Sequence, residues 1–455
     1  MNMIFHKKVV LFFAATIMLL AFLAVGAIEI NKYVAQDKQL FRSSPHLQTS
    51  AFIAIGLAEC WRYPVNPFKA INEQVENIGN SSTLLSIGPI DCHNAEFAVA
   101  VDMGFSWLLA IGHALTDGLP ASVSIVLLAI KLFLVLIVFN ILKIRYGSIT
   151  GLLAVAVLGI CVIVFQIQMY EDRLILVNHN YNWIFYLSSV VLTGGVLYHK
   201  QLSKLFIACA VLLVIFLSLL RISDFYLLVA SVICAQLMYS FSERSVGERK
   251  VVYRAVLFIF SVFFGHYLHD LYVSNKSTHS NYISKHSVIH PIVLGLGKPE
   301  TPFSSKYGYK WGADSETLKV AKSINPNVTQ MYSQSFNSAL LQAYVNGWHE
   351  DPVMMLESYF IKIRSILDGA WWIYMLCIFS LAFAMFSKDY FLVFYVIATL
   401  AKLAEIVIVY PTPYVPMFHQ YVPAMLLMMG LMVLASASNV ISKYVNSPKV
   451  ITRVT

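Results

Sequence analysis

Charged residues are scarce in this sequence. Asp, Glu, Lys and Arg make up 12% of its 455 residues, whereas hydrophobic residues make up 58%, and the mean hydropathy is +0.69. A soluble globule of this size needs more charged residues than that to cover its surface. The composition therefore predicts that a lipid bilayer is the main solvent of the chain.

The short motifs of soluble enzymes are also lacking. The sequence contains no glycine-rich phosphate-binding loop, no HExxH metalloprotease motif, no nucleophile elbow and no paired CxxC. Its 32 Lys and Arg, against 24 Asp and Glu, form no basic patch interleaved with aromatic residues. These absences argue against ATP-driven chemistry, zinc proteolysis and nucleic-acid binding. No internal repeat is evident, which weakens the case for a transporter built from duplicated halves.

Long apolar stretches, by contrast, recur along the whole chain. A helix needs roughly twenty apolar residues to cross the hydrocarbon core, because unpaired backbone amides are not tolerated in lipid. Ten stretches qualify, at about residues 9–30, 121–142, 148–168, 182–198, 204–220, 225–241, 255–272, 367–386, 390–410 and 419–438. The first follows Lys7 and Lys8, and its length favours a retained helix over a cleaved signal peptide, which is the alternative.

The distribution of lysine and arginine predicts the orientation of these helices. If the N-terminus is cytoplasmic, the short outer connectors contain only Arg173 and Arg221. The inner connectors and tails then contain Lys7, Lys8, Lys143, Arg145, Lys200, Lys204, Arg244, Arg249, Lys250, Arg254, Lys388, Lys443, Lys449 and Arg453. This asymmetry follows the positive-inside rule. It predicts a multi-pass protein of the bacterial inner membrane with both termini in the cytoplasm.

The predicted fold class is all-α, a polytopic transmembrane bundle of about ten helices with two large extracytoplasmic segments. Its expected divisions are 1–30 (first membrane helix), 31–120 (outer segment), 121–272 (six membrane helices), 273–366 (outer segment) and 367–455 (three membrane helices and a cytoplasmic tail). Within the first outer segment, residues 98–115 are apolar but interrupted by Asp102. His113 is a second polar interruption, and this pattern predicts a helix that lies on or dips into the outer leaflet.

The second outer segment ends in a helix-start pattern. Asp351 is followed by Pro352, which predicts an N-cap and a proline in the first helical turn. From Val353 the chain is expected to form an amphipathic helix that enters the membrane at the aromatic belt Trp371-Trp372-Ile373-Tyr374.

Six cysteines are present, and two of them lie together outside the apolar stretches. Cys60 and Cys92 both belong to the first outer segment. Because an outer compartment is oxidising, we expect them to form a disulfide. Two free, buried thiols are the alternative.

Carboxylates in the first outer segment are the candidate catalytic groups. Asp37 lies seven residues beyond the first helix, with Lys38 and Arg42 beside it. A carboxylate there is placed to act as general base on an acceptor hydroxyl, while the cations hold a phosphate leaving group. Glu96 and Asp102 are further candidates, expected near headgroup depth. The alternatives are a solvated loop charge for Asp37 and stabilisation of a helix N-terminus for the other two.

Aromatic, basic and glycine residues in the second outer segment are typical of a sugar-binding site. Aromatic faces stack on pyranose rings, and polar groups pair with hydroxyls. The candidate residues are His286, His290, Lys310, Trp311 and Asp314. A loop that only packs against the membrane helices is the alternative. The two histidines, four residues apart, would share a metal if helical, but Pro291 predicts a turn and no third ligand is identifiable.

Charge inside a membrane helix is costly unless it is paired. Lys131, Lys402 and Glu405 lie inside predicted membrane helices. The last two are three residues apart, so we expect a structural ion pair on one helix face, with a proton relay as the alternative. His419, at the outer start of the last helix, is a further candidate for the outer cavity.

The layout of the chain resembles bacterial polytopic glycosyltransferases of the GT-C superfamily. The resemblance lies in one helix, a large acidic outer loop, a helical bundle and a late outer segment. It also lies in His290-Pro-Ile-Val-Leu-Gly-Leu-Gly297 and in His349-Glu-Asp-Pro352 through Tyr359 and Lys362. The Asp-Glu dipeptide usual after the first helix is absent, and only Asp37 stands at a comparable place.

The resemblance implies an inverting sugar transfer from a polyprenyl-phosphate donor to a cell-envelope polysaccharide or lipid. An acidic base would act on the acceptor. Lysine or arginine, with or without a divalent metal (Mg²⁺ or Mn²⁺), would hold the donor phosphate. Lys310, Lys362 and Arg364 are the implied phosphate partners.

Three other functions remain open. An O-antigen-type polymerase is less favoured because Arg42 and Arg62 are the only arginines of the first outer segment. A transporter or flippase would depend on Lys131 and Glu405 rather than on the outer loops. A non-catalytic membrane scaffold would tolerate substitution of all these residues.

Overall fold

The protein is entirely helical where its structure is described. The computed structural model describes residues 107–108, 111, 122–171, 182–199, 203–220, 222–242, 248–276, 287, 289–310, 315–329, 333–409 and 416–446. Within these residues there are thirteen helices and no strand. The predicted all-α class is therefore confirmed for this part of the chain.

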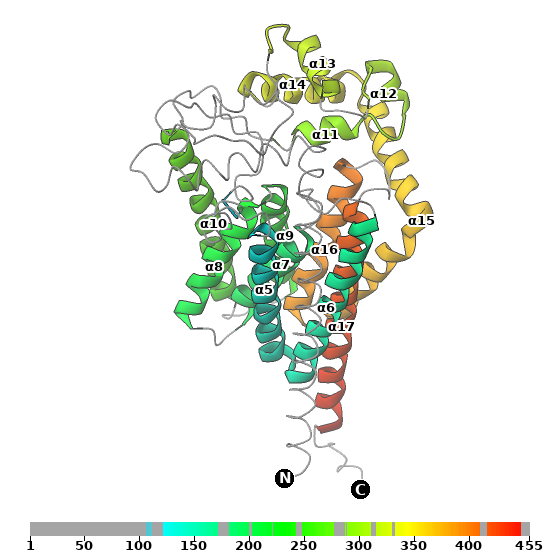
Figure 1. Ribbon diagram of the computed structural model, residues 1–455. Helices are drawn as coiled ribbons and strands as arrows, with labels where there is room; N and C mark the ends of the chain where they lie inside the picture. The colour runs from blue at the N-terminus through cyan, green and yellow to red at the C-terminus, as the bar shows by residue number, and fades with distance from the viewer. Residues whose placement is uncertain are drawn as a thin grey trace.

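A bundle of long helices forms the larger part of the described structure (Figure 1). Its helices coincide with nine of the ten predicted apolar stretches, and the remaining stretch, residues 9–30, lies outside the described residues. The bundle consists of α5 (Ser122–Tyr146), α6 (Ser148–Glu171), α7 (Asn182–Tyr198), α8 (Lys204–Leu219), α9 (Ile222–Ser242), α10 (Glu248–Lys276), the second half of α15 (Pro352–Phe386), α16 (Tyr390–Val409) and α17 (Pro416–Asn446).

Two helices lie at the centre of the bundle. Every residue from 183 to 197 in α7 and from 391 to 399 in α16 is buried. A Cβ placed on Gly194 would lie 3.0 Å from a ring carbon of Phe391. Glycine therefore lets α7 and α16 approach more closely than any larger residue would. Both helices are apolar all round, as expected of helices surrounded by other helices.

A second, smaller unit caps one end of the bundle (Figure 1). We call it the cap; it consists of α11 (Ile289–Gly295), α12 (Pro302–Tyr307), α13 (Ser315–Ile324), α14 (Gln334–Glu350) and the first half of α15. Phe303, Phe336, Leu340 and Met355 are fully buried in its own hydrophobic core. The cap coincides with the predicted second outer segment.

Helix α15 joins the cap to the bundle. It has 35 residues, so it is about 52 Å long, which exceeds the thickness of a hydrocarbon core. The predicted start at Pro352 is confirmed, and Asp351 stands at the predicted N-cap position. The Asp351 side chain makes no capping hydrogen bond. Its carboxylate instead accepts hydrogen bonds from Lys306 and Tyr307 of α12, so it ties two helices of the cap together.

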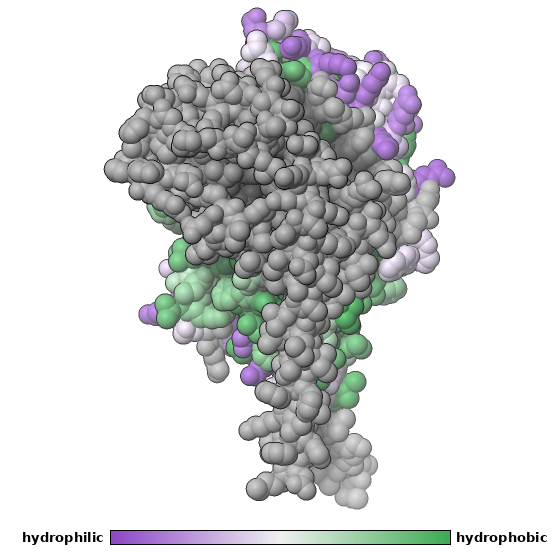
Figure 2. All heavy atoms as spheres, viewed as in Figure 1, coloured by the Kyte–Doolittle hydropathy of each residue, from purple (hydrophilic) through white to green (hydrophobic). Residues whose placement is uncertain are grey.

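Three of the described helices are long and apolar enough to cross a membrane. The apolar spans are Ser223–Ser240 in α9, Val251–Tyr272 in α10 and Tyr421–Ser442 in α17. Apolar side chains such as Phe260 and Phe264 are exposed on α10, and Figure 2 shows apolar residues on the bundle and hydrophilic ones over the cap. Such surfaces require an apolar solvent. By contrast α7 and α8, with 17 and 16 residues, are about 25 Å long, shorter than a hydrocarbon core of about 30 Å.

Candidate functional site

Several predicted site residues lie outside the described part of the chain. The three predicted catalytic carboxylates and the predicted disulfide are among them. These residues are Asp37, Arg42, Cys60, Cys92, Glu96, Asp102, His286, Trp311 and Asp314. The backbone of His419 belongs to α17, but its side chain is not described. The roles of all these residues stay predictions.

The predicted sugar site of the cap has two described members, which differ in burial. His290 is buried, with its ring 5.9 Å from that of Phe336, whereas Lys310 is exposed. The predicted turn at Pro291 is wrong, because α11 begins at Ile289 and includes this proline. Proline fits the first turn of a helix, where its missing N–H has no partner to lose.

The described residues offer no evident metal centre. Within them, no three His, Cys, Asp or Glu side chains gather closely enough to hold an ion. The divalent metal that the resemblance implies therefore has no ligand set in this part of the protein.

A buried lysine lies at the junction of cap and bundle. Lys362 of α15 is 0% exposed, and its Nζ donates a hydrogen bond to the carbonyl of Ile408, at 3.1 Å. Ile408 belongs to the last turn of α16, whose carbonyls carry the negative end of the helix dipole. No carboxylate among the described residues pairs with Lys362. Burial lowers the pKa of this lysine to about 7.

One aromatic ring lies beside Lys362, and two further aromatic side chains contact that ring. Its Nζ lies 5.8 Å from the ring centre of Tyr359. The Tyr359 hydroxyl lies 3.0 Å from that of Tyr344, and its ring stacks on Trp348 with centroids 6.2 Å apart. All three rings are partly exposed. Partly exposed aromatic faces beside a buried cation are chemically suited to a ligand with a sugar and an anionic group.

The structure separates two residues that the resemblance groups as phosphate partners. Lys362 is buried, but Arg364, two residues later on α15, is exposed. Two residues correspond to about 200° around a helix, so the side chains leave α15 on nearly opposite faces. Lys310 is exposed as well. Lys362 is therefore the only one of the three predicted phosphate partners that is enclosed at the junction.

A second buried lysine, Lys402, belongs to α16 itself, six residues before Ile408. The Lys402 Nζ is 2.6 Å from Asp224 Oδ1 and 2.6 Å from Glu405 Oε2. The ring centres of Tyr186 and Tyr421 lie 5.0 and 4.3 Å from the same nitrogen. The predicted Lys402–Glu405 pair is thus confirmed. Asp224 was missed, because it lies on α9, 178 residues away, and no sequence spacing links it to α16.

Lys402 and the carbonyl that Lys362 binds both belong to α16. Glu405 and Ile408 are three residues apart on that helix, which corresponds to a rise of about 4.5 Å. The deeper Lys402 already has two carboxylates, whereas Lys362 has a backbone carbonyl and ring faces. The junction is therefore chemically able to accept an anion at Lys362.

No family model, no curated protein and no solved structure matches the chain.

Proposed function

We propose that this chain is an integral membrane glycosyltransferase. It moves a sugar from a polyprenyl-phosphate donor to a cell-envelope polysaccharide or lipid acceptor on the extracytoplasmic side of a bacterial inner membrane. The observation that carries the proposal is Lys362, a fully buried lysine without a described carboxylate partner at the junction of cap and bundle.

An isolated buried ammonium group is costly. Removing such a charge from water costs several kcal/mol unless a counter-charge compensates it. The carbonyl of Ile408 at the end of α16 supplies only a partial negative charge. A phosphate group supplies a full negative charge. The donor phosphate is therefore the counter-charge that we assign to Lys362.

The proposed orientation places the cap outside the cytoplasm and the chain across the membrane about ten times, with both termini cytoplasmic. Its support is the position of basic residues at the end of the bundle opposite the cap. Lys143 and Arg145 lie in the last turn of α5, Lys204 starts α8, and Lys388 precedes α16. This distribution agrees with the positive-inside rule.

The proposed reaction is an inverting displacement at the anomeric carbon. The acceptor hydroxyl oxygen forms a bond to that carbon, and the bond from the carbon to the donor phosphate oxygen breaks with its electron pair. A carboxylate takes the hydroxyl proton, with Asp37 as the first candidate base and Glu96 and Asp102 as the alternatives. The Lys362 ammonium stabilises the negative charge that develops on the departing phosphate.

The test is a transfer assay with purified protein in proteoliposomes that contain a polyprenyl-phosphate sugar. We expect Lys362→Met to lose transfer while the protein stays folded. Lys310→Met is the matched control, because Lys310 is an exposed lysine of the same cap. Envelope glycans that are identical in cells with and without the gene would contradict the transferase function itself.

A transporter or flippase is the second candidate, and the buried group around Lys402 favours it. Two carboxylates share one lysine inside the bundle, an arrangement that also suits exchange of a proton or a bound ion. In that case Asp224→Asn and Glu405→Gln would abolish movement of substrate across the bilayer. Lys362→Met would then leave activity unchanged, which is the opposite of what the transferase proposal expects.

A further inference from the structure

Three aromatic side chains of the cap form one connected group beside Lys362. We call Tyr344 and Trp348 of α14 and Tyr359 of α15 the aromatic platform. The planes of the Trp348 and Tyr359 rings are 13° apart, and the Tyr344 ring meets that of Trp348 edge-on with centroids 6.4 Å apart. The Lys362 Nζ is 5.8 Å from the Tyr359 ring centre, which is 6.2 Å from that of Trp348, so at most about 12 Å separates the ammonium from the tryptophan ring. A phosphate at Lys362 and a hexose attached to it together cover such a distance.

The residues directly before two of these rings are fixed in the core of the cap. Gly347, before the tryptophan, is buried, and a Cβ placed on it would lie 2.7 Å from the Phe303 ring. Ser358, before the tyrosine of α15, is fully buried and donates a hydrogen bond to Thr301 Oγ1 at 2.9 Å. The platform is therefore held in place by the fold, and a preorganised surface loses little conformational freedom on binding.

The platform combines apolar ring faces with a spare hydroxyl donor. All three rings are partly exposed. The hydroxyls of Tyr344 and Tyr359 lie 3.0 Å apart, so one donates to the other and one O–H remains to donate to a ligand. A pyranose presents a C–H face and a rim of hydroxyls, which match ring faces and a phenolic donor respectively.

Charged side chains are scarce around the platform. Asp351 follows Trp348 by three residues, but its carboxylate accepts hydrogen bonds from Lys306 and Tyr307. Lys362 is the other charged residue within one helical turn of the three rings along α14 and α15. The remaining neighbours at that spacing are apolar: Leu340, Leu341, Val345, Gly347, Pro352, Met355, Leu356 and Ile363. A charged group on the sugar would lose water here without gaining a counter-charge, so the platform suits a neutral sugar.

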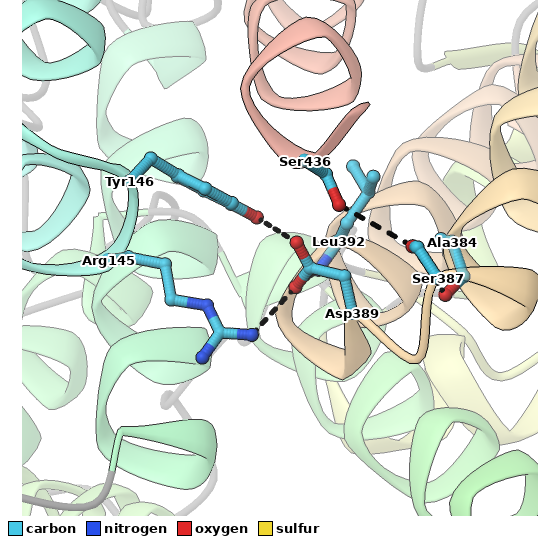
Figure 3. Close-up of polar contacts among 7 residues, drawn as sticks. All are labelled: Arg145, Tyr146, Ala384, Ser387, Asp389, Leu392 and Ser436. Carbon is cyan, nitrogen blue, oxygen red and sulfur yellow. Dashed lines mark hydrogen bonds and ion pairs between the residues drawn. The ribbon is translucent and has the colours of Figure 1, made fainter. Parts of the chain in front are cut away.

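A partly exposed cation at the opposite end of the bundle shows the contrast with Lys362. Arg145 donates to Asp389 Oδ1 at 2.9 Å, and the Tyr146 hydroxyl donates to Asp389 Oδ2 at 2.8 Å (Figure 3). Asp389 thus compensates this guanidinium within the protein. The combination of an enclosed cation and partly exposed ring faces belongs to the cap end.

We propose that the aromatic platform binds the sugar of the donor and that this sugar is a neutral pyranose. The inference rests on the proposed function, in which Lys362 holds the donor phosphate. Trp348 then stacks on the sugar ring, and the tyrosine hydroxyls contact its rim. Trp348 determines which sugar is bound and takes no part in the bond changes.

The test measures the binding of soluble donor analogues to the full-length chain in nanodiscs at pH 6, where the Lys362 ammonium predominates. The analogues are dimethyl phosphate and the anomeric methyl phosphodiesters of glucose, galactose, mannose and N-acetylglucosamine, which all carry one negative charge. Ligand-observed NMR gives the Kd of each. We expect at least one neutral sugar analogue to bind about tenfold more tightly than dimethyl phosphate, as expected of one added aromatic contact. The corresponding diester of glucuronic acid should lack this gain.

Substitutions of two tryptophans separate the platform from the anion site. Trp348→Leu should abolish the gain from the sugar and leave the Kd of dimethyl phosphate unchanged, whereas Trp348→Phe, which keeps a ring, should retain most of the gain. Trp372→Leu is the matched control, because Trp372 is an exposed tryptophan in the bundle half of α15. Its affinities should equal those of the wild type.

Failure of the platform differs from failure of the proposed function. Equal Kd for dimethyl phosphate and all four neutral sugar analogues would overturn the platform, as would an equal loss of sugar and phosphate binding in Trp348→Leu. Either result leaves the anion site at Lys362 standing. An equal gain with glucuronic acid would overturn the neutral sugar. If the wild type bound no analogue at all, the anion site would be refuted, and this inference with it.

Discussion

Two buried lysines at the cap end of the bundle differ in what surrounds them. Lys402 is 1% exposed and contacts two carboxylates, Asp224 and Glu405. Lys362 is 0% exposed and contacts a backbone carbonyl and an aromatic ring. The first charge is compensated within the protein, so its role in the folded state is structural. The second charge lacks such compensation among the described residues, which makes it the better candidate for a substrate anion.

The largest expected effect is on stability, at Lys402. Lys402→Met removes the cation and leaves two carboxylates buried together, so we expect a loss of about 3–5 kcal/mol in unfolding free energy. Thermal or denaturant unfolding of the purified protein in detergent measures it. Adding Asp224→Asn and Glu405→Gln to the variant should restore part of the loss. An unchanged Tm for the single variant would contradict a structural role for this group.

The next effect is on activity, at Lys362. Lys362→Met should lower sugar transfer by about 10²–10³-fold, the usual consequence of losing one group that stabilises developing charge. Tm should stay constant or rise, because an uncompensated buried charge is replaced by an apolar side chain of similar length. A fall in Tm instead would show that Lys362 acts mainly by capping α16. Lys310→Met should change neither quantity.

The pH dependence of donor binding separates the two lysines further. Burial lowers the pKa of Lys362 to about 7, so its ammonium form predominates below pH 7 and is lost as the pH rises above it. Donor affinity should therefore fall with rising pH, by up to about tenfold per pH unit. Titrations of donor binding between pH 6 and 9 measure this. In Lys362→Arg, whose side chain stays charged, the decline should be absent.

The smallest effect is expected at an exposed lysine of the cap. Lys306 pairs with Asp351 on the surface, where solvent screens the charges. Lys306→Ala should leave both Tm and transfer activity unchanged. A clear loss of stability would mean that the tie between α12 and α15 depends on this ion pair more than on the buried Phe303 and Met355.

The sequence predicted the helices of the described bundle because apolar length and the spacing of polar breaks are local properties. It also predicted the helix start at Pro352 and the Lys402–Glu405 pair, which depend only on neighbours along one helix. It mistook Pro291 for a turn, since proline both ends helices and fits their first turn. Asp351 stands at the predicted N-cap position of α15, but its carboxylate binds a lysine and a tyrosine that the fold brings close.

The sequence by itself determined that the chain is helical, apolar and asymmetric in its basic residues. Only the tertiary structure decided that Asp224 completes the ion group at Lys402 and that Lys362 is enclosed while Arg364 is not. The physical reason is that burial and charge pairing depend on contacts between helices far apart in the chain. No periodicity along a single helix encodes those contacts.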